Sequence, residues 1–555
     1  MQNKKNINET EFAIWGTGDR SSSFSKELSK MPVCYIDNDI TKKGTTFFNR
    51  KVCHPSEIED WGKFYIVIAN SFYEEIRLQL QEKGLKEEVD FIYYGKIQNN
   101  KIKLKRLIDE LQASMSRFKE EYKTYQQQTL IFGSMISFDK NSCTNFNQAY
   151  QAVEAETQFL MISETHAIEE RAKEGKINFP YFCLPLMLWQ NYHLTQSSYS
   201  RLEVTREIAD YINNEEYRIN AVQDFEGKNK DIAEGYASLF IYYADRYLRE
   251  LFDFILPKRV CIWNQFYPFH CLIGAICKEK GIDLIYMEYG GLPGTYLIER
   301  TGQMGESAPA VHWKEFQKLE VDEGDIEKAN EIYTFLKTSG INRKEQPENS
   351  ELENAKSIIK KDWPIIVYTG QNDYESGMYP YTDKAKKYHS PIFSGSNEAA
   401  YYLAELAEQN NWNFIYKPHP LCLGEGVEEV RRKLPKNAIL IERCNINDLV
   451  EWADLNITIL STTAYVSLIR EKPVLMLGYT QLYKKGCTYE AFARDEIEAV
   501  IIEAVKAGYT QNQRKAFVEH VARLVKYYAY DDLSERPIRY GKDWRRLFAG
   551  EKIEF

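Results

Sequence analysis

The chain has 555 residues, of which 27% are charged and 44% hydrophobic, and its formal net charge at pH 7 is -10. This length exceeds what one ordinary hydrophobic core holds, so we expect several domains. The composition is typical of a soluble globular protein. The acidic balance argues against broad nucleic-acid binding, which needs a basic surface.

Cysteine usage and the first residues indicate the compartment. The ten cysteines are scattered, and no CxxC spacing occurs at Cys34, Cys53, Cys143 or Cys183, so we expect reduced thiols. The N-terminus has no apolar segment of a signal peptide. No run approaches the roughly 18–20 apolar residues that span a bilayer. We therefore expect a cytoplasmic protein, with peripheral association at the inner face of the cytoplasmic membrane as an extension of that expectation.

Residues 1–97 have the pattern of a small α/β domain. The sequence predicts strands and a helix that alternate along this segment, at 12–15, 33–36, 64–69 and 73–83. A strand, a glycine turn, a helix and a strand ending in an acid outline a Rossmann half. The fingerprint is incomplete, because Gly16 and Gly18 are present but Ser21 stands where the third glycine belongs. We interpret this segment as a Rossmann-like accessory domain that binds no dinucleotide, with nucleotide binding as the alternative.

The next segments are a connecting helix and a second α/β region. Residues 98–128 are charged with helical spacing and predict a linker helix. Residues 129–345 form an α/β domain with a largely helical stretch at 198–256. Its later strands are predicted at 259–263 and 282–287, and a charged interdomain segment at 320–354.

Residues 346–510 predict a further α/β domain, followed by a helical tail at 511–555. The predicted strands are 365–368, 414–416, 438–441, 455–459 and 474–477, and their alternation with helices indicates a mostly parallel sheet. Two Rossmann-like halves with a terminal helix that can cross back describe the GT-B architecture of glycosyltransferases. The predicted fold class is therefore α/β, a GT-B-like pair of Rossmann-like domains plus the small N-terminal one.

Two strand ends in residues 346–510 carry the residues typical of an anion site. Lys417 and His419 follow the strand 414–416, and Ser461, Thr462 and Thr463 open a helix after the strand 455–459. Ligands of open α/β sheets bind outside the carboxyl ends of the strands. A cation, a histidine and a helix N-terminus at that edge predict a phosphate site. His419 is also a candidate catalytic residue, because it can offer a hydrogen bond or a proton near neutral pH. The alternatives are a turn whose histidine caps a carbonyl group and a serine-threonine motif that only caps its helix.

Glu288 is the candidate catalytic carboxylate. It directly follows the predicted strand 282–287 and begins the glycine-rich segment 288–294, a backbone shaped for close approach of a ligand. Glu288 can serve as a general base, as a nucleophile or as a partner for an oxocarbenium ion. The alternative is a loop glutamate paired with an arginine.

Two further polar pairs follow predicted strands. Gln371 and Asp373 come after the strand 365–368 and are candidates for binding donor hydroxyl groups or phosphate. Asn264 and Gln265 end the strand 259–263 and are candidates for holding an acceptor sugar. Each pair is equally compatible with an ordinary polar loop. No metal-ligand cluster of useful spacing is present, so we expect transfer without a metal and without a cofactor.

The C-terminal half resembles bacterial capsule polysaccharide biosynthesis proteins of the Kdo-transferase type. The resemblance rests on segments 288–294, 370–373, 417–420, 461–464 and 472–478 and covers roughly residues 255–490. It implies a GT-B fold, a CMP-activated acidic sugar as donor, and contacts with the nucleotide phosphate from His419, Lys417, Ser461 and Thr462. The loop after Gly370 matches the family's pattern only loosely, and the domain at 11–95 lies outside the usual core.

The predicted function is therefore glycosyl transfer in the synthesis of a cell-surface polysaccharide of capsular or O-antigen type. The donor is a nucleotide sugar, an acidic CMP-activated sugar such as Kdo being the expected example, and the acceptor is a glycan or glycolipid. The expected partners include a membrane assembly complex but no nucleic acid. Two alternatives stay open: a polyol-phosphate transferase of the CDP-glycerol type, and a non-catalytic nucleotide-binding scaffold.

Overall fold

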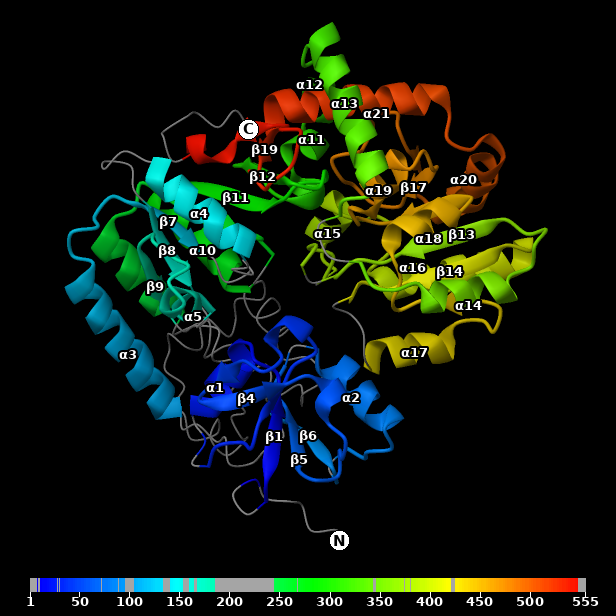
Figure 1. Ribbon diagram of the computed structural model, residues 1–555. Coiled ribbons are helices and arrows are strands. Elements are labelled where there is room, and N and C mark those ends of the chain that lie inside the picture. Colours follow the sequence, from blue (N-terminus) through cyan, green and yellow to red (C-terminus); the bar gives the residue numbers. More distant parts are fainter. Residues whose placement is uncertain are drawn as a thin grey trace. The chain divides into compact units, whose positions relative to one another are not determined.

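The computed structural model divides the chain into two compact units. One consists of residues 1–144 and 160–257, and the other of residues 145–159 and 258–555. The residues that the structure describes are 7, 10–26, 28, 30–70, 72–87, 89–94, 104–132, 140–152, 159–163, 167–184, 244–266, 268–342, 346–373, 375–379, 381–420 and 425–547. Each unit is described by itself below (Figure 1).

The first unit begins with a six-stranded sheet in the order β3-β4-β2-β1-β5-β6. Its elements are β1 (Phe12–Trp15), α1 (Asp19–Lys26), β2 (Tyr35–Ile36), β3 (Thr46–Phe47), β4 (Arg50–Cys53), β5 (Tyr65–Ile68), α2 (Tyr73–Glu82) and β6 (Phe91–Tyr93). The sheet is parallel except for the β3–β4 pair. The alternation predicted for residues 1–97 is therefore confirmed, with the second strand shorter than expected.

The glycine turn of this sheet is explained by packing. Gly16 has a φ of +129°, and a Cβ there would lie 2.6 Å from the carbonyl oxygen of Ala69, so only glycine fits. Ser21 fills the place of the third glycine and donates a hydrogen bond to the same carbonyl (2.6 Å). Asp37, the acid after β2, accepts hydrogen bonds from Thr17 and from Lys42. The turn is thus built from contacts within the domain.

The rest of the first unit follows with a long helix and three short strands. The elements are α3 (Leu104–Glu121), β7 (Thr129–Phe132), α4 (Lys140–Ala152, which extends into the second unit), β8 (Phe159–Ser163), α5 (Ala167–Lys173) and β9 (Tyr181–Cys183). The predicted linker helix corresponds to α3, and residues 98–103 lie outside the described residues. Of the helical stretch predicted at 198–256, residues 198–243 also lie outside them, and residues 244–255 are helical.

The second unit contains two sheets. In the first, β20, β19, β12, β11 and β10 lie side by side in that order. The elements are β10 (Arg259–Trp263), α10 (Pro268–Lys280), β11 (Asp283–Tyr289), β12 (Thr295–Glu299), β19 (Ala529–Asp531) and β20 (Lys542–Asp543). The prediction of a purely helical tail at 511–555 was wrong, because β19 returns to pair with β12.

The glycine-rich segment is the turn of a β-hairpin. The strand predicted at 282–287 continues to Tyr289, and β12 pairs with it in antiparallel register, with Glu288 opposite Leu297. A Cβ at Gly290 would overlap the side chain of Thr295, and Gly294 has a φ of +84°. The strand predicted to end at 287 therefore extends two residues farther and includes Glu288. The strand extends through it because the turn allows an immediate antiparallel return.

The second sheet of this unit is parallel, with the order β15-β14-β13-β16-β17-β18. Its strands are β13 (Ile365–Thr369), β14 (Asn413–Lys417), β15 (Ile439–Leu440), β16 (Leu455–Thr458), β17 (Val474–Met476) and β18 (Tyr489–Glu490). Five of these strands were predicted and β18 was not. All six have their carboxyl ends on one edge, as a site at the strand ends requires.

Helices surround these two sheets. They are α11 (Ala308–Val311), α12 (Trp313–Gln317), α13 (Glu323–Ser339), α14 (Ser350–Ile358), α15 (Asp383–Tyr388), α16 (Ser396–Asn410), α17 (Glu425–Lys433), α18 (Ile446–Trp452), α19 (Thr463–Ile469), α20 (Arg494–Ala507) and α21 (Gln511–Arg523), which a π-helical turn (Leu524–Tyr528) extends. The segment 320–354, predicted as a charged interdomain segment, forms most of α13 and α14.

Helices α13 and α21 pack side by side and connect the two sheets (Figure 1). Their buried side chains, among them Ile332 and Phe517, join Leu297 of β12 and Leu468 of α19 in one hydrophobic core. Each fully buried aliphatic or aromatic side chain stabilises the fold by roughly 1.5–3 kcal/mol relative to exposure. This shared core fixes β12 and α19 relative to each other, and with them the residues they carry.

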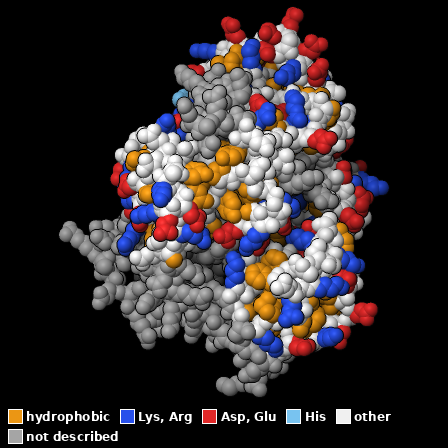
Figure 2. Space-filling model, turned by 60° about the vertical axis from the view of Figure 1, so that its left-hand side comes forward, with side chains coloured by type: hydrophobic (Ala, Val, Ile, Leu, Met, Phe, Trp, Pro, Cys, Tyr) orange, Lys and Arg blue, Asp and Glu red, His pale blue; other side chains and the backbone are white. Residues whose placement is uncertain are grey.

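The surface carries both acidic and basic side chains, as the composition indicates. On the described part of the face in Figure 2, acidic and basic side chains are interspersed, which fits a chain with 71 Lys and Arg against 81 Asp and Glu.

Among the described residues, no helix combines the length and the apolar character needed to cross a bilayer.

Candidate functional site

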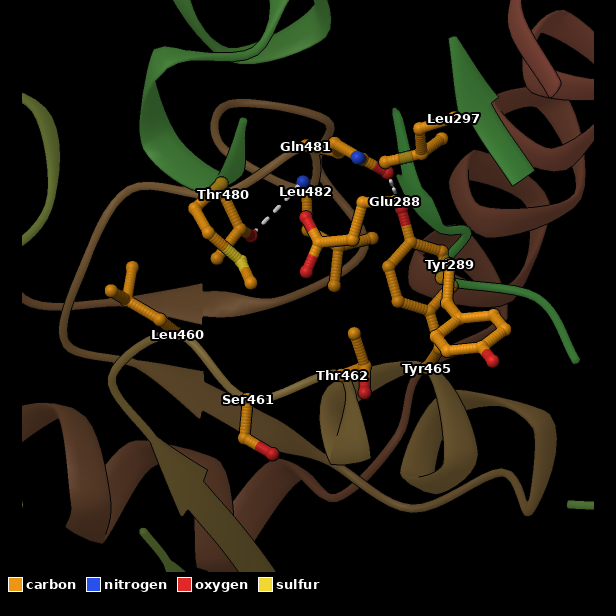
Figure 3. Close-up of a pocket in the computed structure, with 12 residues that line it drawn as sticks. Glu288, Tyr289, Leu297, Leu460, Ser461, Thr462, Tyr465, Thr480, Gln481 and Leu482 are labelled. Carbon is orange, nitrogen blue, oxygen red and sulfur yellow. Dashed lines mark hydrogen bonds between the residues drawn. The ribbon is translucent and has the colours of Figure 1, made fainter. Parts of the chain in front are cut away.

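A small cavity lies in the second unit between the β11–β12 hairpin and the start of α19 (Figure 3). Its volume of about 30 Å³ is room for roughly one or two water molecules. The lining residues are Glu288, Tyr289, Gly291, Leu297, Met304, Leu460, Ser461, Thr462, Tyr465, Thr480, Gln481 and Leu482. Both sheets of the unit therefore contribute to it, and a substrate larger than water must enter from its open side.

Glu288 reaches the cavity from β11, where the strand pairing fixes its backbone. Nε2 of Gln303 lies 3.4 Å from its carboxylate. Gln303 is itself held, because it donates to the carbonyl of Met287 (3.0 Å) and accepts from the backbone N–H of Gln265 (2.5 Å). Gln303 was not identified from the sequence, since nothing in its local pattern distinguishes it from a loop residue.

Ser461 and Thr462 form the opposite wall. Thr458 accepts a hydrogen bond from the backbone N–H of Ser461 (3.1 Å), and Ser461 accepts one from that of Thr463 (3.3 Å). The helix opens at Thr463 as predicted, but the hydroxyl of Thr463 pairs with Thr369 (2.6 Å) below the sheet edge. The structure thus brings Ser461 and Thr462, but not Thr463, to the same cavity as Glu288.

Lys417 does not lie past the end of its strand, as expected, but is its last paired residue. Only 7% of it is exposed, and its ammonium donates to the carbonyls of Pro418 (3.0 Å) and Glu442 (2.7 Å). Burial lowers the pKa of Lys417 below its usual value. The hydrogen bond to Glu442 connects the end of β14 to the segment that follows β15.

His419, two residues farther on, is partly exposed. The shared strand-end edge predicted for His419 and Ser461 is confirmed, but β13 lies between their strands, and two strand spacings amount to roughly 10 Å. Neither Lys417 nor His419 is among the described residues that line the cavity. Their predicted contact with a phosphate remains a prediction.

Gln371 and Asp373 lie in the loop after β13 and bond to each other and to the start of α16. Asp373 accepts from the backbone N–H of Ser396 (2.9 Å) at the start of α16 and from Nε2 of Gln371 (2.6 Å). Burial raises the pKa of Asp373, although these hydrogen bonds oppose the rise. Within the described part of the chain, Oε1 of Gln371 has no hydrogen-bond partner.

Asn264 connects the first sheet to the loop that follows β13, whereas the backbone N–H of Gln265 bonds to Gln303. Asn264, with a φ of +71°, donates to the carbonyl of Glu375 (2.9 Å) and accepts from the backbone N–H of Phe266 (2.8 Å). The ring of the neighbouring Phe266 packs against His389 (5.3 Å between ring centres). Contact of this pair with an acceptor remains a prediction.

A largely buried carboxylate not identified from the sequence, Glu306, contacts a histidine and a lysine. Nε2 of His389 lies 3.4 Å and Nζ of Lys384 lies 3.0 Å from the carboxylate of Glu306. Burial acts to raise the pKa of Glu306, but the hydrogen bond to His389 and the charge of Lys384 lower it overall. A Cβ at Gly305 would overlap the backbone of Tyr388. The segment that carries Met304 into the cavity is thus fixed against the second sheet.

Among the described residues, no three His, Cys, Asp or Glu side chains lie close enough together to hold a metal ion. The nine described cysteines form no disulfide with one another.

Family models identify two segments of the chain. Residues 326–519 match the family described as capsule polysaccharide biosynthesis protein. The resemblance predicted for the C-terminal half is thereby confirmed. Residues 8–89 match a second family, described as C2185-like, N-terminal, and this range contains β1 to β5 of the six-stranded sheet. No curated protein is significantly similar to the chain in sequence.

Several solved structures are similar at low identity. A KpsC beta Kdo 2,7 transferase of Thermosulfurimonas dismutans is 17% identical over 51% of this chain and 81% of its own, with a TM-score of 0.32. A UDP-GlcNAc 2-epimerase of Methanocaldococcus jannaschii is 12% identical over 72% and 99%, with a TM-score of 0.33. The calicheamicin glycosyltransferase CalG4 is 9% identical over 72% and 94%, with a TM-score of 0.29.

The capsule-family segment contains one wall of the cavity. It includes Ser461, Thr462, Tyr465 and Gln481, whereas Glu288 and Gln303 precede it. The predicted α/β class is confirmed by the strand order of the sheets themselves. The site residues of the family segment therefore meet a carboxylate supplied by another part of the same unit.

Proposed function

We propose that this protein is a glycosyltransferase that takes part in the synthesis of a capsular or similar surface polysaccharide. One observation carries the proposal: a cavity at the strand ends of the capsule-family segment faces the carboxylate of Glu288. A carboxylate opposite hydroxyl groups and a helix start is a suitable setting for glycosyl transfer, in which negative charge develops on the leaving phosphate.

In this proposal, the two walls of the cavity have different roles, one in the chemical step and the other in binding the donor. Glu288 acts as the base for the acceptor hydroxyl or as the nucleophile, and Gln303 keeps its carboxylate directed into the cavity. Ser461 and Thr462 hold the end of the donor at which the phosphate leaves. His419 extends the phosphate site along the sheet edge, while Lys417 supports that edge from inside.

The finer parts of the proposal rest on the resemblance of the sequence. They are an acidic CMP-activated donor such as Kdo, transfer without a metal or cofactor, a glycan or glycolipid acceptor, and a cytoplasmic location at the membrane surface near an assembly complex. The GT-B arrangement of residues 129–345 and 346–510, with the 1–97 domain as an accessory, belongs to the same proposal.

The test is release of nucleotide from a panel of nucleotide sugars in the presence of glycan acceptors. We expect release from one or a few donors, CMP-activated acidic sugars first, together with a new glycoside in the product. Release of CMP with a phosphodiester product would instead identify a polyol-phosphate transferase. Absence of release from every donor, combined with a nucleotide-induced thermal shift, would identify a binding scaffold.

A further inference from the structure

A row of three hydrogen-bonded side chains connects helix α21 to the wall of the cavity. Nε2 of His520 on α21 lies 3.0 Å from the hydroxyl of Tyr465 on α19, and that hydroxyl lies 3.2 Å from Oε1 of Gln481. All three side chains are buried, and Tyr465 and Gln481 line the cavity. In Figure 3 the ring of Tyr465 extends from α19 toward Gln481.

The direction of these hydrogen bonds follows from protonation. Burial lowers the pKa of His520 well below its usual value, and the charges of Lys485 and Arg523 lower it further, so the imidazole is neutral and has one N–H. Burial raises the pKa of Tyr465 well above its usual value, so its hydroxyl keeps one proton to donate. Two directions along the row are then available.

Only one direction leaves every buried N–H satisfied. If the Tyr465 hydroxyl donated to His520, the single N–H of His520 would sit on Nδ1, which has no partner among the described residues. A buried donor without a partner is rarer and costlier than a bare acceptor lone pair. His520 therefore donates from Nε2 to Tyr465, and Tyr465 donates to Oε1 of Gln481.

Packing holds the middle of the row in place. The ring of Tyr465 lies against Gly291 of the β11–β12 turn, where a Cβ would come within 2.5 Å of the ring. The ring is thus confined between the hairpin that carries Glu288 and the histidine on α21.

The consequence concerns the free end of Gln481. Because its oxygen is fixed on Tyr465, its amide nitrogen is the remaining polar atom, and no described residue accepts a hydrogen bond from it. We propose that Gln481 binds an oxygen of the substrate through this N–H₂ group, and that His520 is the positioning residue that fixes the direction of the amide. The acceptor is an oxygen of the sugar, its carboxylate or the donor phosphate. This inference rests on the proposed function of the cavity.

Gln481→Glu is the most direct test, because it keeps the oxygen that Tyr465 bonds and replaces the donor by a second oxygen. We expect at least a tenfold rise in KM for the nucleotide sugar with a melting temperature close to that of the unaltered protein. Gln409→Glu, on the exposed side of α16, makes the same charge change and should leave KM unaltered. Binding of the free nucleotide to Gln481→Glu shows which oxygen the amide binds. Weakened binding indicates an oxygen of the phosphate, and unchanged binding indicates an oxygen of the sugar or its carboxylate. An unchanged KM in Gln481→Glu overturns the proposal.

The role of His520 is tested by a pair of variants. Glutamine can place an N–H near the position of Nε2, and leucine cannot, so His520→Gln should keep KM near that of the unaltered protein and His520→Leu should raise it as Gln481→Glu does. Equal KM values for both variants, with both proteins folded, would contradict the positioning role.

A spectroscopic measurement tests the row without any activity. In protein with ¹⁵N-labelled histidine, the signal lost in His520→Gln should show the neutral Nε2–H tautomer. The Nδ1–H tautomer would reverse the row and overturn the inference. Because this readout needs no substrate, the inference is judged even if no nucleotide sugar is turned over and the proposed function fails.

Discussion

The β11–β12 hairpin and the end of β14 can be compared, because each region places one ionisable residue in the protein interior and another where a ligand can reach it. Each carries two ionisable residues close together in sequence or register, and each buries one of them in the fold. In the hairpin, Glu299 is buried, bonded to Tyr528 and to the backbone N–H of Ala308, while Glu288 lines the cavity. At the end of β14, Lys417 is bonded to two carbonyls, while His419 is partly exposed.

This comparison separates residues that hold the site from residues that act in it. A charge whose hydrogen bonds are supplied by the protein stabilises one arrangement of the backbone and has little left to offer a ligand. Glu299 anchors the segment that carries Gln303 and Met304, and Lys417 anchors the strand end before His419. The variants below should therefore divide into effects on turnover and effects on stability.

Glu288→Gln should have the largest effect. It keeps the size of the side chain and its contact with Gln303 but removes the charge, and loss of a positioned base or nucleophile lowers rate by roughly 10²–10⁴-fold. We expect kcat to fall by at least a hundredfold, measured as nucleotide release, with nucleotide binding retained. Glu279→Gln, an exposed change on α10, is the matched control. Retained turnover would remove Glu288 from the chemistry.

Lys417→Met should act on stability instead. The change leaves the carbonyls of Pro418 and Glu442 without their donor, which costs about 1–3 kcal/mol in the free energy of unfolding. Lys436→Met, at an exposed position, should change stability by less than about 0.5 kcal/mol. Denaturant unfolding measures both. If Lys417→Met were as stable as the control but lost nucleotide binding, the lysine would be a ligand-binding residue and the comparison would fail at β14.

The sequence predicted most strands, but it did not predict the strands whose position depends on antiparallel pairing with β11 or β12. The strands at 12–15 and 259–263 have the predicted limits, because uninterrupted apolar runs end in a glycine or in amides. The strand at 529–531 was missed, since three residues give no alternation to detect and its place depends on pairing with β12. The hairpin was missed because its glycines are equally typical of a ligand-binding loop.

The candidate site was predicted in part for a similar reason. Glu288, Ser461 and Thr462 stand at strand or helix ends that local patterns reveal, and the cavity brings them together. Gln303, Tyr465 and His520 take their places through contacts between segments far apart in sequence. No local pattern marks such residues, because only the shared core of α13, α19 and α21 brings them to the cavity.

His419→Ala tests whether the accessible residue at the end of β14 binds a ligand. The residue is partly exposed and should contribute little to stability, but its loss should weaken binding of the donor nucleotide about tenfold, or about 1.4 kcal/mol. The measurement is the shift in melting temperature that CMP or a related nucleotide induces. An undiminished shift would confine the nucleotide to the Ser461 and Thr462 side of the sheet edge.

Glu299 should act on the pH dependence of the free energy of unfolding. Burial raises the pKa of Glu299 to about 8, although hydrogen bonds from Tyr528 and Ala308 oppose the rise. Between its ordinary value of 4.5 and 8, the folded protein binds more protons at this site than the unfolded chain does. The free energy of unfolding should therefore fall as pH rises through that window, by about 1 kcal/mol per pH unit.

Glu299→Gln tests this directly, since glutamine stays neutral, keeps one oxygen for the backbone N–H of Ala308 and can donate from its N–H₂ group to the hydroxyl oxygen of Tyr528. We expect denaturant unfolding to show a flatter stability profile from pH 5 to 8 than in the unaltered protein, with the two proteins most different at pH 8. Glu288→Gln should not flatten that profile to the same extent. If it did, the two carboxylates of the hairpin would share one role, and the distinction between the anchoring and the acting residue would not hold.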